Sequence, residues 1–252
     1  MKLRHHKAKT LLFILYICIK RLVEKIKKWK GYIFELVLIF ISVWFGFFLS
    51  EWSSSEGEKL TENKILTEIR NGIRSDLEDF ESNVYGHNLS LQGISAFRGW
   101  MVDKPIRKDS LAIYYYVLLR DYIPVINRSG YESLKTSGLK TIINDSLRHQ
   151  IINLYEFHYK IIDELEDGVQ EMKDYDNFFH PVNAILNPYF DYDEKGRIVG
   201  ITPNRFSEKE RKEMMSYLWR VENNKKFKVS QYNIVIEEMK KLEKNITEEL
   251  KN

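Results

Sequence analysis

Cysteine is nearly absent from this sequence. The 252 residues contain a single one, Cys18, so the chain cannot form an intramolecular disulfide. This excludes a small secreted module held together by disulfides, because such modules need paired cysteines to stabilise a small core. We interpret Cys18 as a small apolar side chain that is buried or faces lipid.

The motifs of the common catalytic sites are missing as well. The six histidines include no Glu-x-x-His or His-x-x-x-His pair, the spacings that place metal ligands on one helical face. The sequence contains no glycine-rich phosphate loop, nucleophile elbow or metalloprotease signature. His149 and His158 are nine residues apart on one predicted helix, and we interpret them as core or surface residues. No catalytic residue, cofactor or metal ligand is therefore predicted, and an enzyme has no positive support.

One long apolar run, Tyr32–Ser50, organises the rest of the chain. At about 1.5 Å rise per residue it is close to the roughly 30 Å hydrocarbon thickness of a bilayer. Trp29 and Lys30 precede the run and Trp52 follows it, as expected of anchors at the two headgroup layers. The sequence therefore predicts a single transmembrane helix over residues 31–52.

The polar and small residues of this run share one helical face. Glu35, Ser42, Gly46 and Ser50 fall on that face, and the last three form a small-residue ladder with a spacing of four. Such a ladder lets two helix backbones approach closely, so we expect this face to contact another transmembrane helix. Two interpretations of Glu35 stay open: its carboxyl group faces a helix partner, or it stays protonated or extends toward the cytoplasmic interface.

Charge is distributed very unevenly along the chain. Residues 1–30 carry ten Lys or Arg and one acid, Glu24, which gives +9, so the remaining residues sum to 3 − 9 = −6. The positive-inside rule then predicts a cytoplasmic N-terminus in a bacterial inner membrane, with residues 53–252 forming a periplasmic domain. A nucleic-acid binder is not expected, because the basic excess is confined to the flank of a membrane span.

A second apolar run, Thr10–Ile19, is too short to span a bilayer. No small-residue cleavage site follows it, which argues against a signal peptide. We predict that residues 1–30 form a basic amphipathic helix that lies on or dips into the membrane and binds anionic lipids of the cytoplasmic leaflet. A docking helix for a partner membrane protein is the alternative.

Apolar residues recur at intervals of three and four through most of residues 53–252, and this periodicity predicts an all-α helical bundle. We expect a hinge at Ser53–Gly57, followed by a long helix that ends before Asp103. A short helix is expected to end at Gly138, with Asp109 and Asn144 near helix starts. The other predicted helices cover residues 111–120, 146–177, 207–221 and 228–250.

A small β-hairpin insertion is predicted at Pro188–Ile201, around the turn Asp193–Gly196. Asp191–Thr202 partly imitates a calcium loop, but a lysine and a threonine replace two ligands, so calcium binding is not predicted. The acid runs Asp163–Glu164 and Glu166–Asp167 are interpreted as a solvated helix face.

A family resemblance rests on the ordered combination of several modest motifs. Tyr32–Ile39 with small residues through Gly46, then Glu51–Trp52, Ser137–Arg148 and Leu154–Glu156, resembles an uncharacterised Bacteroidota family of single-pass membrane proteins, known only as a domain of unknown function. This chain differs in its heavier basic, apolar N-terminal extension and in its serine at position 42, near where glycine is expected. The resemblance implies an envelope protein with a helical extracytoplasmic domain, and it supplies no activity.

Two function hypotheses follow. The favoured one is a membrane-anchored interaction or scaffold subunit that forms a homo-oligomer or joins other envelope membrane proteins. The alternative is an ion-coupled or channel-like subunit that uses Glu35 within the membrane.

Overall fold

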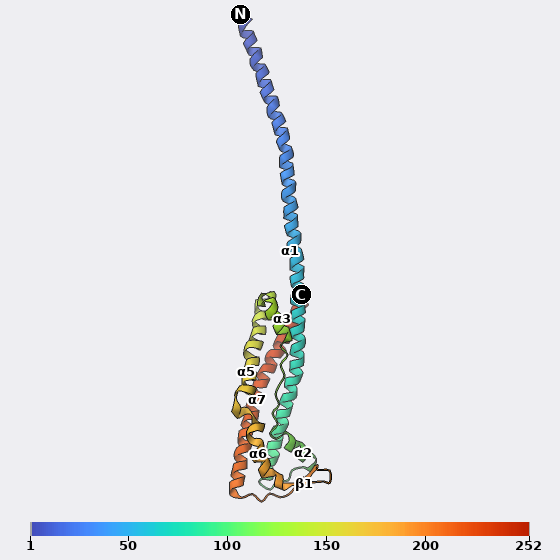
Figure 1. Cartoon of the computed structure of the whole chain (residues 1–252), viewed down its shortest axis with the longest axis vertical. Helices are drawn as coiled ribbons and strands as arrows, with labels where there is room; N and C mark the ends of the chain where they lie inside the picture. Colours follow the sequence, from blue (N-terminus) through green and yellow to red (C-terminus); the bar gives the residue numbers. More distant parts are fainter. Residues whose placement is uncertain (1, 252) are drawn as a thin grey trace. The chain divides into compact units, whose positions relative to one another are not determined.

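The computed structural model describes the backbone of residues 2–251, while the side chains of residues 1–15, 18, 22, 25–31, 52–55 and 252 lie outside the described residues. The predicted all-α class is confirmed, since the only strands of the described chain form one two-stranded hairpin (Figure 1). The chain divides into two compact units, Met1–Leu60 and Thr61–Asn252.

The first unit is the N-terminal part of α1 (Lys2–Trp100). Its apolar residues 32–50 are exposed on every side, and by length and composition this is one helix able to cross a membrane. The prediction of a hinge at Ser53–Gly57 is wrong, because the backbone is helical throughout this stretch. The reason is that it contains no proline and one glycine, and serine lowers helix stability by only a few tenths of a kcal/mol.

The second unit is built around three long helical segments that pack side by side (Figure 1). They are the C-terminal part of α1, the segment that begins with α4 (Asp145–Asn153) and continues through α5 (Tyr159–Asp163), and α7 (Glu208–Glu249). Ion pairs Arg74–Glu243 (2.6 Å) and Arg98–Glu222 (2.5 Å) show that α1 and α7 run antiparallel. The apolar stripe of α1 predicted from the sequence is confirmed as core, since Leu66, Ile69 and Phe80 are fully buried.

The remaining elements cover this three-helix core. They are α2 (Lys108–Val117), α3 (Ser129–Ser137), α6 (Asp174–Leu186), the 3₁₀ turns η1 (Leu139–Thr141), η4 (Gln170–Met172) and η5 (Asn187–Tyr189), and the strands β1 (Phe190–Tyr192) and β2 (Ile198–Ile201). The predicted hairpin is confirmed: β1 and β2 are antiparallel, and Gly196 has a φ of +73° in the turn between them. Gly138 ends α3 as predicted, with a φ of +93°.

Two of the predicted helix caps are confirmed, and one is not. Asn144 caps α4 by accepting a hydrogen bond from the Leu147 amide, and Ser207 and Glu210 form the expected capping box of α7. Asp109 is not a cap, because α2 already begins at Lys108 and the Asp109 carboxylate binds Arg107 instead.

Two predictions of helix extent are wrong. The helix expected over residues 146–177 ends at Gly168, and it contains two wide π-helical turns, η2 (Leu154–His158) and η3 (Glu164–Gly168). The two helices expected over residues 207–221 and 228–250 are the single helix α7. Asn223 and Asn224 weaken a helix without breaking it, and the Asn224 side chain is held by buried hydrogen bonds in the folded chain.

The core of the second unit consists of two apolar clusters with a polar layer between them. One cluster joins α1, α3, the α4–α5 segment and the C-terminal half of α7, and the other joins the end of α1 with α2, α6, the hairpin and the start of α7. Between them lie buried polar residues of α1, η3, α6 and α7: Asn83, His87, Ser90, Glu166, Asp174, Asn224, Lys225 and Lys228.

Candidate functional site

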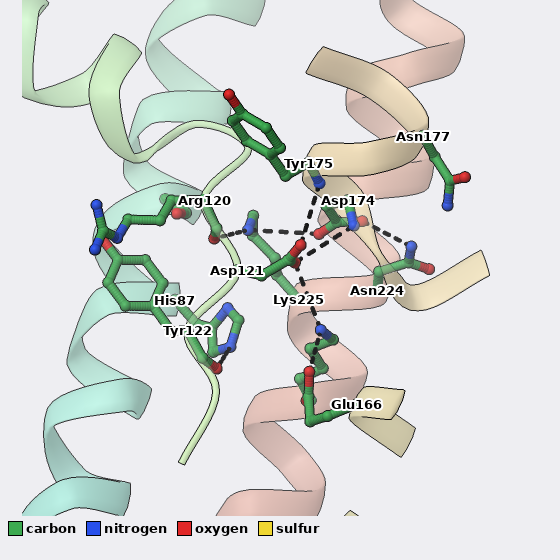
Figure 2. Close-up of polar contacts among 12 residues, drawn as sticks. His87, Arg120, Asp121, Tyr122, Glu166, Asp174, Tyr175, Asn177, Asn224 and Lys225 are labelled. Carbon is green, nitrogen blue, oxygen red and sulfur yellow. Dashed lines mark hydrogen bonds and ion pairs between the residues drawn. The ribbon is translucent and has the colours of Figure 1, made fainter. Parts of the chain in front are cut away.

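The polar layer contains a cluster of buried ions around the loop that connects α2 to α3 (Figure 2). We call it the ion cluster and define it as Asp121, Glu166, Asp174, Lys225 and Lys228. The side chains of Lys225 and Asp174 are 0% exposed, and those of Lys228 and Glu166 are 1% and 3% exposed. Burying a charge is costly unless it is paired and hydrogen-bonded, so the contacts of each member decide what the cluster can do.

Asp174 and Lys225 form one half of the ion cluster. Lys225 Nζ lies 3.4 Å from Asp174 Oδ2 and donates to the Arg120 carbonyl oxygen at 3.0 Å. Asn224, the neighbour of Lys225 on α7, donates to Asp174 Oδ1 at 2.8 Å and to the Glu171 carbonyl oxygen at 2.8 Å. The first residue of α6 is thereby fixed against the middle of α7.

Glu166 and Lys228 form the other half. Lys228 Nζ donates to Glu166 Oε2 at 2.7 Å and lies 3.6 Å from Asp121 Oδ1. The Tyr232 hydroxyl donates to Glu166 Oε1 at 2.5 Å and lies 3.0 Å from the Tyr122 carbonyl oxygen. The interpretation of Glu166 as part of a solvated acidic face is therefore wrong.

Glu166 lies in the wide turn η3, next to the buried Leu165. A π-helical turn holds one more residue than an α-helical turn, so two consecutive side chains can face the same side. Leu165 and Glu166 are both buried in η3, as Leu154 and Tyr155 are in η2.

Asp121 links the two halves and also binds the N-terminus of α6. Its carboxylate accepts hydrogen bonds from the backbone amides of Asp174 (3.3 Å) and Tyr175 (3.2 Å). These amides have no partner within the helix, and a carboxylate stabilises the positive end of the helix dipole. The capping of α6 is thus supplied by a loop 53 residues earlier in the chain.

Burial shifts the protonation equilibria of the layer. Desolvation is the largest cause in each case: it raises the pKa of Asp174 to about 6 and lowers the pKa of Lys225. His87, whose Nε2 hydrogen-bonds the Tyr122 carbonyl oxygen at 3.0 Å, has its pKa lowered to about 3 by burial, with smaller contributions from the charges of Lys225 and Lys228. His87 is therefore neutral at physiological pH.

This arrangement of buried polar groups can hold the backbone of the α2–α3 loop in a fixed position. Three consecutive residues of the α2–α3 loop are held by it: the Arg120 carbonyl oxygen, the Asp121 carboxylate and the Tyr122 carbonyl oxygen. A cavity of about 460 Å³ reaches Asp121, Glu166 and Lys228 from the surface, and both acidic and basic side chains line it. Within residues 2–251, no group of three or more His, Cys, Asp or Glu is placed to hold a metal ion.

The sequence-predicted contact face lies apart from the ion cluster, in the first unit. Glu35, Ser42, Gly46 and Ser50 are all exposed. The Ser42 hydroxyl donates to the Leu38 carbonyl oxygen of its own helix at 2.8 Å, and a Cβ added at Gly46 would meet no atom within 4 Å. Whether this face meets another helix stays a prediction.

The predicted interface anchors Trp29, Lys30 and Trp52 have side chains that lie outside the described residues, as does the side chain of Cys18. His149 is exposed on α4, and His158 is partly buried in η2. The buried histidine of the described chain is His87.

Comparisons with protein-family models, with curated proteins and with solved structures give no match. No family is assigned on this ground. The resemblance drawn from Tyr32–Ile39 and Ser137–Arg148 to an uncharacterised membrane-protein family stays a prediction.

The ion cluster was not predicted from the sequence, although the spacing of two lysines on α7 indicates it. On α7, Val221, Lys225, Lys228 and Tyr232 follow each other at intervals of four, three and four, so both lysines occupy positions of the apolar stripe. A lysine inside such a stripe indicates a buried acidic partner, since an unpaired buried ammonium group is very costly. The partners themselves could not be read from the sequence, because they come from η3, α6 and the α2–α3 loop.

Proposed function

We propose that this chain is a single-pass membrane protein of a bacterial envelope, whose helical unit serves as an interaction subunit of a larger assembly. In this proposal the basic N-terminal residues lie at the cytoplasmic face and bind anionic lipids. The unit Thr61–Asn252 lies in the periplasm. The proposal includes no catalytic step.

The observation that carries the proposal is the exposed apolar helix of the first unit. Every residue from Tyr32 to Ser50 is exposed, and the large side chains of Phe40 and Phe47 are 71% and 72% exposed. An apolar helix of this length that is covered by no other part of the described chain is stable in a bilayer or against other helices. A soluble protein rarely exposes so large a contiguous apolar surface.

The small-residue face supports an assembly rather than a lipid anchor alone. Glycine lowers helix stability by about 1 kcal/mol relative to alanine, so it is usually retained where a backbone must come close. In the described chain no atom lies within 4 Å of a Cβ added at Gly46, and the proposal assigns this contact to a helix of another molecule. Glu35 on the same face has no hydrogen-bond or ion-pair partner among the described residues, which leaves the ion-coupled alternative open.

The test is the size of the full-length protein in mild detergent, measured by light scattering. Gly46→Leu inserts a bulky side chain into the proposed helix contact and should shift the oligomer toward monomer. Val37→Leu is the matched control, because Val37 is exposed on the opposite side of the same helix and should leave the size unchanged.

Glu35→Gln separates the two hypotheses. A polar contact between transmembrane helices contributes only about 1 kcal/mol, so this substitution should weaken assembly less than Gly46→Leu does. An ion-coupled subunit would instead keep its assembly in Glu35→Gln and lose its cellular function. A wild-type monomer, or Gly46→Leu assemblies of wild-type size, would contradict the proposal.

A further inference from the structure

A cleft of about 880 Å³ lies between α2, α6 and the β1–β2 hairpin, on the second unit. Its volume falls within the range of about 300–1,000 Å³ typical of small-molecule sites. Leu118, Leu119 and Val182 are buried at its base. The cleft is separate from the transmembrane face and is lined by no member of the ion cluster.

Aromatic rings line much of this cleft. Tyr115 and Tyr116 come from α2, and Tyr175 and Phe179 come from α6. The Tyr175 and Phe179 rings stack with centroids 4.5 Å apart and planes at 18°, while Tyr116 is 61% exposed. Tyr175 is 49% exposed, so rings on both sides of the cleft are open to solvent. Such a lining favours a flat aromatic guest, because contacts between rings add to the area that it buries.

The charged residues that line the cleft are both arginines, Arg120 and Arg197. Arg197 is paired with Asp193 at 2.7 Å. Arg120 has no carboxylate partner among the described residues: its guanidinium binds the Tyr116 hydroxyl and lies 5.1 Å from the Tyr116 ring centroid and 5.8 Å from that of Tyr122. A guanidinium with free donors beside an apolar cleft is suited to a planar anion such as a carboxylate.

The ion cluster fixes the position of this arginine. The Arg120 carbonyl oxygen accepts from the buried Lys225, and the two following residues are held by α6, α7 and His87. Figure 2 shows the Arg120 guanidinium extending away from the buried ion pairs. The buried charges thus hold the backbone on one side, while the exposed guanidinium remains available on the other.

We propose that the cleft between α2, α6 and the hairpin binds a small aromatic monoanion, with its ring against the tyrosine faces and its carboxylate on Arg120. This makes the second unit a ligand-binding domain, a property that does not depend on the proposed assembly role. The net positive lining and the absence of an acid among the cleft residues distinguish this ligand from a cation or a neutral sugar.

The experiment is isothermal titration of the full-length protein in phosphatidylcholine nanodiscs, with empty nanodiscs as the blank. The probes are 2-naphthoate, its neutral analogue 2-naphthamide and the aliphatic anion octanoate. We expect saturable binding of 2-naphthoate and affinities at least about tenfold lower for the other two probes. The neutral 2-naphthamide lacks the charge-assisted bond to Arg120, and octanoate lacks the aromatic ring that stacks.

Variants locate the site. Arg120→Gln should weaken 2-naphthoate binding about tenfold or more and leave 2-naphthamide unchanged. Ala112→Trp places a bulky ring in the cleft and should abolish binding of both. Arg107→Gln removes an exposed arginine just before α2 that does not line the cleft, so it is the matched control and should bind as wild type does.

Three results would overturn the proposal: no saturable binding of 2-naphthoate, equal affinity of wild type and Arg120→Gln, or octanoate binding as tightly as 2-naphthoate. Unfolding midpoints of the variants are measured alongside. Arg120 and Ala112 are exposed, so we expect both variants to unfold at the wild-type midpoint.

Discussion

Lys225 and Lys228 occupy positions on α7 where an apolar side chain would ordinarily lie, and both are buried with acids. A buried ion pair is weak evidence for stability, because removing two ions from water costs several kcal/mol each. What the ion cluster adds is orientation: its bonds point to specific atoms of the α2–α3 loop and of α6. An apolar layer at this level would fill space without selecting those backbone positions.

His87 is buried in the same polar layer, and burial changes its titration. Its pKa is lowered to about 3, whereas the pKa of a histidine in the unfolded chain is near 6.5. Between these two pH values the imidazole is protonated in the unfolded state and neutral in the folded state. The stability that His87 contributes is present above about pH 6.5 and is lost as the pH falls toward 3. Asp174 and Asp76, a buried residue of α1 that accepts a hydrogen bond from the Tyr159 hydroxyl, have the opposite effect. Burial raises the pKa of each to about 6, so each lowers the stability of the fold as the pH rises from about 4 to 6.

We predict that His87→Gln reduces the acid sensitivity of the fold. Between about pH 7 and pH 4 the wild type should lose about 3 kcal/mol of unfolding free energy relative to the variant. The comparison isolates His87, because the two aspartates are present in both proteins. The measurement is the urea midpoint of the full-length protein in detergent as a function of pH.

His149→Gln is the control for this prediction, since His149 is exposed on α4 and should leave the wild-type profile unchanged. Parallel pH profiles for wild type and His87→Gln would show that the His87 side chain is not desolvated in the folded protein.

Among the elements, α3 approaches α1 so closely that one position requires glycine. A Cβ added at Gly130 would lie 2.6 Å from the Ile69 backbone nitrogen and 2.9 Å from its Cα. Backbone atoms of a long helix cannot move aside as a flexible side chain can. The contact therefore fixes the position of α3 on the three-helix core.

We predict that Gly130→Ala destabilises the second unit by about 2–3 kcal/mol, because overpacking forces a backbone shift. Gly99→Ala is the matched control: the nearest atom to its added Cβ is Lys104 Cβ at 3.7 Å, an ordinary contact. That variant should be neutral or up to about 1 kcal/mol more stable. The free energy of unfolding of both variants is measured by chemical denaturation. Equal losses of stability in Gly130→Ala and Gly99→Ala would mean that α3 does not pack this closely against α1.

For the whole molecule, the charge asymmetry about the apolar run determines the expected orientation. The first 30 residues carry +9 and the rest −6. A reporter enzyme that is active only in the periplasm, fused after Asn252, should therefore be active. Replacing Lys25, Lys27, Lys28 and Lys30 by glutamine should lower that activity by admitting inverted molecules. Activity of a cytoplasm-only reporter at the same fusion point would reverse the topology.

The sequence by itself determined the elements whose evidence is local. The apolar run Tyr32–Ser50, the stripe of α1, the turn at Gly196 and the capping box at Ser207 depend on neighbours within a few residues, so their patterns are readable. The contact face of Glu35, Ser42, Gly46 and Ser50 is also predicted from a local pattern, and it stays a prediction.

Tertiary structure alone decided the ion cluster and the continuity of α7. Glu166 is buried against Lys228 and Tyr232 of α7, and Asp121 binds backbone amides of α6, up to 54 residues away. Asn224 continues α7 because Asp174 and the Glu171 carbonyl oxygen bind its amide. These effects depend on the pairing of groups distant in sequence, and the free energy of a buried charge is set by whichever groups the fold places around it.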